Sequence, residues 1–338
     1  MNNTFTRLTL VVTLLLSNIF LITPARTSAG RAEVTISSCD VVGGYTIKRA
    51  HFAKIPSTQT LAYDIITELT EGSTTLMRET FNQDRFYEKE VLLITADEQT
   101  AGIGYNGRAW QSPPGNIYAT FIFPWPEKDR KLLFFVSQIT NLAVCETVEH
   151  FGLRPQIKWI NDMLLDGKKS AGVLCKVEGD IQLYQRDGSL LDEDYASLVV
   201  GIGLNVNMDQ ALATERFDAT SDRLKVPFTS MSIDRGRKFV VEEVLDILKM
   251  RLLENYLVLL DTQDPKPLVS KISTRLAYVG QEVEYTEDTM NGGVIHTRRL
   301  KVLGITTDGA APGSIILSDG GETFTTFNGR IRPVTQTT

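Results

Sequence analysis

Cysteine and histidine are both scarce in this chain of 338 residues, with three of each. The cysteines Cys39, Cys145 and Cys175 are odd in number and widely spaced, so they cannot form a disulfide framework. No CxxC motif or Cys/His spacing typical of a zinc site is present. Three histidines also leave little material for a His-based catalytic triad or metal centre. These absences exclude disulfide-rich domains and zinc modules.

An excess of positive charge is missing as well. The 35 Lys and Arg residues are outnumbered by 41 Asp and Glu, which gives a net charge of −6. A protein that binds the phosphate backbone needs a basic face, so we do not expect nucleic acid to be the main partner. Internal repeats and low-complexity tracts are also absent. With 42% hydrophobic and 22% charged residues, the chain is typical of a folded protein with one large domain or two smaller ones.

Uncharged apolar residues form one long run, residues 8–22, which follows Arg7 and precedes the small residues Thr27, Ser28 and Ala29. This layout is typical of a secretory signal peptide, and the run is short for a bilayer span. An uncleaved anchor, the first part of a two-step organelle address and a misassigned start codon are alternatives. We expect residues 1–29 to be a signal-like or targeting segment outside the fold, with membrane contact only if it stays uncleaved.

The hydrophobic pattern beyond residue 45 predicts an α+β fold, with a mixed, mostly antiparallel sheet flanked by helices. Strands are expected at residues 45–52, 90–96, 115–123, 156–161, 172–178 and 197–206, and helices at 57–69, 132–151 and 239–260. Ser57 or Thr58 is the expected N-cap of the first helix. The polar stretch 70–89 reads as a long loop or an extra hairpin. Short strands at 282–285, 300–306, 314–318 and 323–327 predict a small C-terminal β-barrel.

The first segment that can carry chemistry is residues 102–107, which spell GxGxxG after a predicted strand. A dinucleotide fold is not expected, because residues 108–114 (RAWQSPP) cannot form the helix whose N-terminus would receive a pyrophosphate. The segment can instead act as a mobile cover, in which Arg108 offers a guanidinium to phosphate and Trp110 a face to a base. The alternative is a surface loop with Trp110 filling the core.

The second segment joins residues 158–162 (KWIND) to residues 168–174 (KKSAGVL). Strand-like apolar residues alternate here with Lys, Asn and Asp, which cost several kcal/mol if buried unpaired, so a site is indicated. A tight Asp166-Gly167 turn should return the chain and place Lys169 near Asn161 and Asp162. The small residues 170–172 would leave room for a ligand. The alternative is that the lysines are solvated surface charges.

The third segment is residues 200–207 (VGIGLNVN). Gly201 and Gly203 interrupt a β-branched strand, which marks close approach by another group. The Asn205 amide could then pair with a purine edge. A bulge with a structural asparagine explains the same pattern.

In order and approximate spacing, these segments resemble those of the biotin protein ligases, over roughly residues 50–334. The resemblance rests on residues 57–59 (STQ), Gln99 before the 102–110 loop, the KWIND and KKSAGVL segments, residues 201–205 and the C-terminal strands. It implies a class II synthetase-like catalytic domain over residues 45–270 and an SH3-like β-barrel over 273–334. The implied reaction forms biotinyl-5′-AMP from biotin and ATP. It then transfers biotin to a lysine on the biotin carrier domain of a biotin-dependent carboxylase.

The resemblance also implies roles for individual residues, with Mg²⁺ bound through the ATP phosphates. Lys169 would contact the biotin carboxylate and the α-phosphate, and Asp162 would orient the incoming lysine. The implied catalytic residues are Lys169, Asp162 and Arg108. The implied biotin-binding residues are Ser57, Thr58, Gln59, Gln99, Gly102, Ile103, Gly104, Tyr105, Lys169 and Gly172. The implied ATP- or adenylate-binding residues are Trp110, Lys158, Asn161, Gly201, Gly203 and Asn205.

The glycine-rich loop departs from the family pattern. Bacterial members often read GRGRRGRxW, whereas Ile103, Tyr105 and Asn106 replace three arginines here and only Arg108 remains. Losing one charge-assisted contact typically costs roughly 1.5–3 kcal/mol, so we expect an active enzyme that retains its adenylate loosely. Residues 31–56 are too few for the winged-helix DNA-binding domain of some relatives, so repressor function is not expected.

Two other functions stay open. A lipoate ligase would share the fold and the adenylate chemistry, although an RRxSGGGxV-like loop is missing. A non-catalytic biotin-binding protein would share the binding residues alone. For location, the N-terminal segment suggests the secretory route or organelle targeting, while ATP-dependent chemistry favours the cytoplasm or an ATP-containing organelle.

Overall fold

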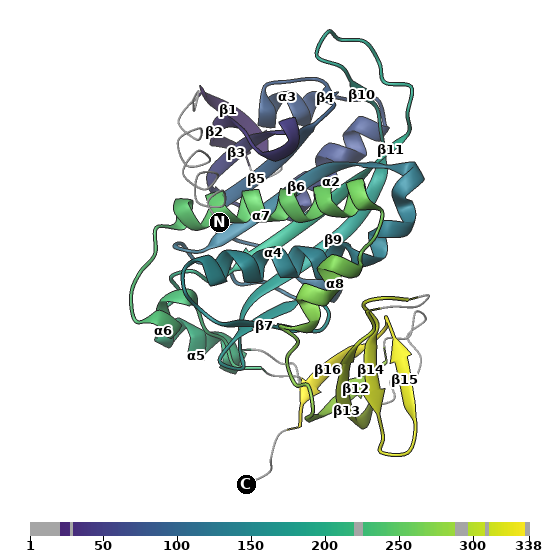
Figure 1. The fold of residues 1–338 in the computed structure, drawn as a ribbon. Helices are drawn as coiled ribbons and strands as arrows, with labels where there is room; N and C mark the ends of the chain where they lie inside the picture. Colours follow the sequence, from purple (N-terminus) through teal and green to yellow (C-terminus); the bar gives the residue numbers. More distant parts are fainter. Residues whose placement is uncertain (1–20, 28–29, 220–225, 288–296, 308–310, 335–338) are drawn as a thin grey trace, which may run out of the picture. The chain divides into compact units, whose positions relative to one another are not determined.

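The computed structural model describes residues 21–27, 30–219, 226–287, 297–307 and 311–334 of the chain (Figure 1). The contacts divide these residues into two compact units. Unit 1 comprises the described residues up to Arg130 together with Cys175–Ile202, and unit 2 comprises Lys131–Leu174 and the residues from Gly203 onward. The domain boundaries expected from sequence, 45–270 and 273–334, stay a prediction.

The main sheet has nine strands in the order β1-β2-β3-β5-β6-β11-β9-β8-β7. The pair β3–β5 is parallel, whereas β1–β2, β2–β3, β5–β6, β7–β8 and β8–β9 are antiparallel. The predicted mixed, mostly antiparallel sheet is therefore confirmed.

Unit 1 places helices against the strands of this sheet. Its elements are β1 (Leu21–Thr27), β2 (Gly30–Asp40), η1 (Val42–Gly44), β3 (Thr46–Ile55), α2 (Thr58–Thr70), α3 (Thr75–Phe81), β4 (Phe86–Tyr87), β5 (Glu90–Gln99), η2 (Tyr105–Gly107), β6 (Ile117–Pro126), β10 (Leu183–Tyr184) and β11 (Tyr195–Leu204), whose last two residues belong to unit 2. The short strands β4 and β10 pair in parallel. Helix α2 packs on β5 and β6. The core between the helix and the sheet contains fully buried side chains such as Phe52, Ile65 and Ile94.

Two expectations for unit 1 are corrected. The polar stretch 70–89 contains helix α3, which forms because Met77 and Phe81, one helical turn apart, are both buried in the core. Residues 21–27, expected outside the fold, form β1 paired with β2. The rest of the apolar run, up to residue 20, lies outside the described residues, so the signal peptide stays a prediction.

Unit 2 contains the remaining helices and the C-terminal strands. Its elements are α4 (Val136–His150), β7 (Pro155–Lys158), β8 (Asp162–Leu165), the start of β9 (Lys168–Ile181), α5 (Gln210–Ala219), α6 (Met231–Arg235), α7 (Val241–Thr262), α8 (Lys266–Ser273), β12 (Glu282–Thr286), β13 (Thr297–Ile305), β14 (Ile315–Ser318), β15 (Thr323–Thr326) and β16 (Arg330–Pro333). Helix α7 runs alongside α4 (Figure 1). The 3-10 helix η3 (Glu127–Phe135) leads into α4, and together they form the one described helical stretch apolar and long enough to cross a membrane. Because 72% of its most apolar window is buried inside the protein, it reads as a core helix.

The predicted C-terminal β-domain is present as a five-stranded antiparallel sheet in the order β15-β14-β13-β12-β16 (Figure 1). The strand β16 adds to those expected from sequence. The described pairings leave β15 and β16 as edges, so they form an open sheet rather than a closed barrel.

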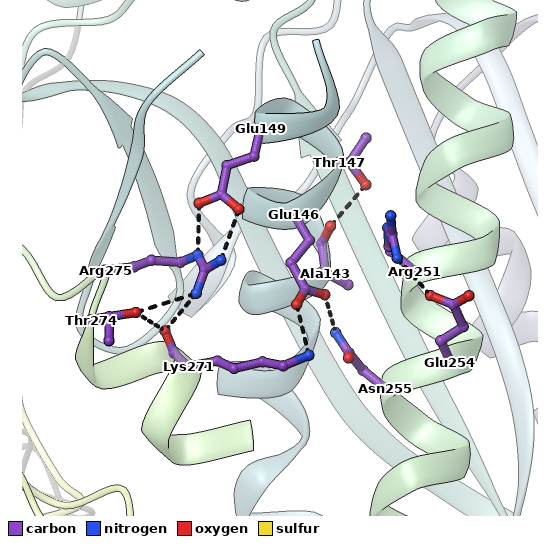
Figure 2. Close-up of polar contacts among 10 residues, drawn as sticks. All are labelled: Ala143, Glu146, Thr147, Glu149, Arg251, Glu254, Asn255, Lys271, Thr274 and Arg275. Carbon is purple, nitrogen blue, oxygen red and sulfur yellow. Dashed lines mark hydrogen bonds and ion pairs between the residues drawn. The ribbon is translucent and has the colours of Figure 1, made fainter. Parts of the chain in front are cut away.

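A polar network fastens α8 to α4 within unit 2 (Figure 2). The Arg275 guanidinium donates to both carboxylate oxygens of Glu149, at 2.7 and 2.8 Å. Glu146 accepts from Lys271 at 3.0 Å and from Asn255 of α7 at 2.9 Å. A bidentate pair constrains both distance and orientation, so the network fixes where the chain leaves α8.

Candidate active site

A chain of hydroxyl and amide groups lies at the start of α2 in unit 1. Ser57 caps the helix, since its side chain accepts from the backbone N–H of Thr60 at 3.2 Å. The backbone N–H and the hydroxyl of Thr58 both donate to Oε1 of Gln99, at 2.9 and 3.1 Å. The Gln59 amide donates to the Tyr63 hydroxyl at 2.8 Å. The structure therefore brings together the four predicted biotin-binding residues Ser57, Thr58, Gln59 and Gln99.

Two further residues complete this network. The Thr120 hydroxyl of β6 lies 2.9 Å from the Thr58 hydroxyl and 3.2 Å from Oε1 of Gln59. Ser112 accepts from the Gln99 amide at 2.8 Å and donates to the Trp110 carbonyl at 2.8 Å. Neither residue was assigned a role from sequence. A threonine inside the apolar run of β6 is the signal that could have indicated Thr120, because a buried hydroxyl needs a partner.

The glycine-rich segment is a hydrogen-bonded hairpin rather than the start of a dinucleotide fold. Its backbone hydrogen bonds run from Gln99 N–H to Ser112 O, from Trp110 N–H to Gly102 O and from Gly104 N–H to Arg108 O, at 2.7–3.1 Å. The tip is the turn η2, in which Tyr105 is 42% exposed and Arg108 is exposed. Ile103 bridges Ala109, and Trp110 is half-buried. The strand that follows is antiparallel β6, which confirms that no crossover helix is present. Closure of this hairpin over a ligand stays a prediction.

Gly102 is required by the close packing of this hairpin. A Cβ at that position would lie 2.4 Å from the Trp110 carbonyl oxygen and 2.7 Å from Oγ of Ser112. We expect Gly102→Ala to disrupt the hairpin and the Gln99–Ser112 contact, at a cost of about 1–3 kcal/mol, and to weaken biotin binding. Hydrogen exchange at the Trp110 amide and calorimetric titration with biotin would measure both effects.

The matched comparison is Gly104→Ala, whose Cβ would meet only the Arg108 carbonyl oxygen at 3.5 Å, an ordinary contact. We expect the Trp110 amide of this variant to keep its protection. Equal loss of protection in both variants would contradict the packing argument.

In unit 2, the KWIND segment is a turn between two strands, not one continuous strand. The strand expected over residues 156–161 ends at Lys158, and β8 begins at Asp162. Lys158 and Asp162 are a directly opposed pair, so their side chains lie on one face. Trp159 lies in the turn, where its Nε1 donates to the carbonyl of Gly313 at 3.3 Å.

The hairpin β8–β9 brings Lys169 to the same face. Asp166 and Gly167 both have positive φ, 47° and 70°, as the predicted tight turn requires. Asp162 opposes Gly172, while Leu164 opposes Lys169, so Ser170 is an unpaired bulge residue. Leu164 is two positions from Asp162 on β8 and shares its face, so the tight turn places the Lys169 ammonium on the side of Asp162. The bulge then brings Gly172, rather than Ala171, opposite Asp162.

The result is a carboxylate held between two ammonium groups. Oδ2 of Asp162 lies 2.7 Å from Nζ of Lys158, and Oδ1 lies 2.5 Å from Nζ of Lys169. Burial alone would raise the pKa of Asp162, but the charges of Lys158 and Lys169 and their hydrogen bonds hold it well below its usual range. The three side chains are mostly buried, at 9% exposure for the carboxylate and 15% and 22% for the lysines. This arrangement presents two fixed cations to an anionic ligand.

Main-chain contacts hold Lys169 and the bulge in place. The Lys169 N–H donates to Pro227 O at 2.7 Å, and its carbonyl accepts from Thr229 N–H at 2.9 Å. Ser170 O accepts from Asn205 N–H at 2.8 Å, and the Asn205 side chain donates to Thr229 O at 3.0 Å. Asn205 thus joins β11 to the segment that flanks Lys169. Its predicted contact with adenine stays a prediction.

The other residues predicted to bind ligand lie on these strands or next to them. Asn161, a predicted adenylate residue in the turn before β8, donates its side chain to Val173 O at 3.3 Å. Gly172, a predicted biotin-binding residue, directly opposes Asp162. Gly201 and Gly203 are both in β11, on either side of the boundary between the units. The three predicted catalytic residues fall into two sets, because Lys169 and Asp162 are in unit 2 and Arg108 is in unit 1.

Sequence reasoning missed two supporting residues in unit 2. The side chain of Asn141, fully buried in α4, donates to the main-chain carbonyl of Asp162 at 2.9 Å. An asparagine in the middle of an apolar helix is the signal that could have indicated it. The second residue is Tyr278, in the segment between α8 and β12. It was missed because this segment has no regular hydrophobic pattern.

Metal ligands were not assigned from sequence, and no site is seen in the described part of the chain. There, no three His, Cys, Asp or Glu side chains form a group that could hold a metal ion.

Part of the chain is similar in sequence to known proteins. The sequence matches the model of the Biotin/lipoate A/B protein ligase family over residues 65–186. It is 30% identical over 161 residues to the bifunctional ligase/repressor BirA of Bacillus spizizenii, covering 46% of this chain and 44% of the relative. It is 28% identical over 196 residues to the biotin–[acetyl-CoA-carboxylase] ligase of Paracoccus denitrificans, covering 56% of this chain and 72% of the relative. The chain thus spans less than half the length of the first of these relatives.

A solved structure shows the same fold. The biotin protein ligase from Aquifex aeolicus, in complex with biotin and ATP, superimposes with a TM-score of 0.57 at 23% identity, over 84% of this chain and 97% of that one. At this identity, the likeness shows the fold alone. The chain is therefore similar in sequence to the biotin/lipoate A/B protein ligase family over residues 65–186, and similar in fold to a biotin protein ligase.

Proposed function

We propose that this chain is an ATP-dependent biotin protein ligase, which forms biotinyl-5′-AMP and transfers biotin to a lysine of a carrier domain of a biotin-dependent carboxylase. The observation that carries the proposal is the Lys158–Asp162–Lys169 cluster, in which Asp162 holds two ammonium groups on one face of the sheet. The relatives named as biotin ligases, and the neighbour solved with biotin and ATP, favour this substrate pair.

The first step joins two anions, so it needs positive charge. A carboxylate oxygen of biotin attacks the α-phosphorus of ATP, a new P–O bond forms, and the bond to pyrophosphate breaks. Negative charge is concentrated on the non-bridging oxygens as the two groups approach. Lys169 would contact the carboxylate and the α-phosphate there, and a preorganised cation at the site of developing charge is the main source of stabilisation in such steps.

In the second step, the amine of the carrier lysine attacks the acyl carbon, the bond from that carbon to the phosphate oxygen breaks, and AMP leaves. The amine must lose a proton as the amide forms. Asp162 is a poor general base, because the depressed pKa keeps its carboxylate ionised and weakly basic. It would therefore orient the amine rather than remove its proton.

Mg²⁺ belongs to the proposal only as the ion that accompanies ATP. It would be held by the ATP phosphates and would supply charge neutralisation there. The requirement for ATP also leads us to propose that the protein acts in the cytoplasm or in an ATP-containing organelle. Fractionation and N-terminal sequencing of the native protein would test this location.

The experiment for the proposed function compares substrates directly. The purified chain is incubated with ATP, Mg²⁺ and either biotin or lipoate, and ATP–pyrophosphate exchange is measured before transfer to a carrier domain. We expect exchange with biotin and little with lipoate. Exchange with lipoate alone would favour a lipoate ligase. Biotin binding without any exchange at saturating substrates would favour a non-catalytic biotin binder and overturn the proposal.

A further inference from the structure

Tyr278 packs against a group of side chains that includes Leu164, two residues from Asp162, although it is more than 100 residues away in sequence. It stands in the segment that leads from α8 to β12. The Ile157 N–H donates to Arg275 O at 2.8 Å, and the Ala277 N–H donates to Ile157 O at 2.9 Å. The segment therefore pairs with β7 at the residue that precedes Lys158.

This segment has a fixed starting point. Arg275 is tied to Glu149 of α4 by the bidentate pair shown in Figure 2, and one of its terminal nitrogens also donates to Lys271 O at 2.8 Å. The same residue supplies the carbonyl that pairs with β7. Tyr278 follows three residues later, so its position relative to β7 is set by helix packing as well as by the strand pairing.

The Tyr278 side chain points into the interior of unit 2. Its φ of 65° is in the left-handed region, which is uncommon for a bulky residue. The ring packs with a small cluster formed by Leu164, Val226 and Ala277. Leu164 is two positions from Asp162 on the same strand face, and Val226 precedes the proline that accepts the Lys169 N–H.

The Tyr278 hydroxyl is buried, and it has no hydrogen-bond partner among the described residues. Such a group is costly, since a buried donor without a partner loses about 1–3 kcal/mol of hydration. Burial and then the negative charge of Asp162 raise the pKa of Tyr278 to about 12. The phenol therefore stays protonated, and it interacts with the Asp162 carboxylate through space.

The carboxylate will need another donor when ligand binds. Lys158 contacts one oxygen of Asp162 and Lys169 the other. Under the proposed function, Lys169 turns toward the biotin carboxylate and the α-phosphate. Oδ1 of Asp162 would then be left buried and without a partner, which opposes the movement of Lys169.

We propose that Tyr278 is a positioning residue that donates its hydroxyl to Asp162 when Lys169 is released to the substrate. The Tyr278 hydroxyl then donates a hydrogen bond to the carboxylate oxygen that Lys169 has left. Lys169 can therefore leave Asp162 without leaving a buried charge unpaired. This inference rests on the proposed function, because it needs an anionic ligand at Lys169.

A double-mutant cycle tests the inference, with the dissociation constant of a non-reactive biotinyl-adenylate analogue as the readout. In the otherwise unchanged full chain, we expect Tyr278→Phe to weaken binding about tenfold. Its melting temperature should not fall, and should rise if anything, because the change removes a buried hydroxyl that has no partner to lose. In a Lys169→Met background, Tyr278→Phe should have no further effect, since no lysine leaves Asp162. The matched control is Tyr285→Phe, which removes the hydroxyl of another buried tyrosine of unit 2, bonded to Asn328 O.

Three other outcomes would overturn the inference, and each has a different meaning. Equal losses from Tyr278→Phe in both backgrounds would mean that the hydroxyl affects binding independently of Lys169. Unchanged binding by Tyr278→Phe alone, with the analogue still bound tightly by the wild-type chain, would reject the hydroxyl's role but leave the proposed function standing. No binding of the analogue by the wild-type chain would reject the proposed function itself.

Discussion

Replacing Lys169 with alanine should lower the rate of ATP–pyrophosphate exchange by about 10²–10³-fold. Removing one preorganised group that stabilises developing charge typically has this effect, and Lys169 is a cation that its pairing with Leu164 holds on the face of Asp162. The rate at saturating biotin and ATP is the measurement, because the loss should persist when binding is complete.

Lys168 provides the matched control, because it precedes Lys169 on β9 but is exposed. Lys168→Ala removes the same charge from the same strand. Because this charge is at an exposed position, the change should leave the exchange rate nearly unaltered. Equal losses in the two variants would mean that net charge, rather than the position of the Lys169 ammonium, matters. Both variants should first be shown to unfold at similar temperatures.

The second large effect is expected from Asp162→Asn. This change leaves the mostly buried ammonium groups of Lys158 and Lys169 beside each other without a carboxylate between them. Breaking a buried ion network in this way costs about 3 kcal/mol, and we expect the free energy of unfolding to fall by that amount at pH 7. Urea titration of the variant and the wild type measures the difference.

The pH dependence of unfolding gives a second measurement on the same variant. The pKa of Asp162 is depressed in the folded state, so its contribution is complete above the unfolded value of about 4. It is then lost as the pH falls toward the lower folded value. The wild type should therefore lose stability faster than Asp162→Asn as the pH is lowered from about 5 to 2. Asp166→Asn is the control, because this exposed turn residue can keep its left-handed conformation as asparagine. Parallel pH curves for wild type and Asp162→Asn would contradict the depressed pKa.

The sequence correctly predicted the positions of those site residues that are set by local geometry. The cap at Ser57, the Asp166-Gly167 turn and the approach of Lys169 to Asp162 all follow from turn chemistry and strand pairing. The break between β7 and β8 was not predicted, because apolar residues continue through the KWIND segment and give no sign of a turn. Tyr278 could not be assigned for another reason. Its contacts come from long-range packing, which leaves no periodic pattern around it.

The two-residue turn at Asp166 and Gly167 also sets a limit on how the hairpin can change in length. Side chains alternate between the two faces of a strand, so the face on which Lys169 lies depends on its pairing with Leu164. One residue added between Gly167 and Lys169, with the two-residue turn kept, would place Lys169 opposite Met163 and turn the ammonium away from Asp162, although every charged group would still be present. The contacts between the two lysines and the aspartate therefore depend on the length of the turn as well as on the charges. A change in chain length at this hairpin should be harder to tolerate than most substitutions within it.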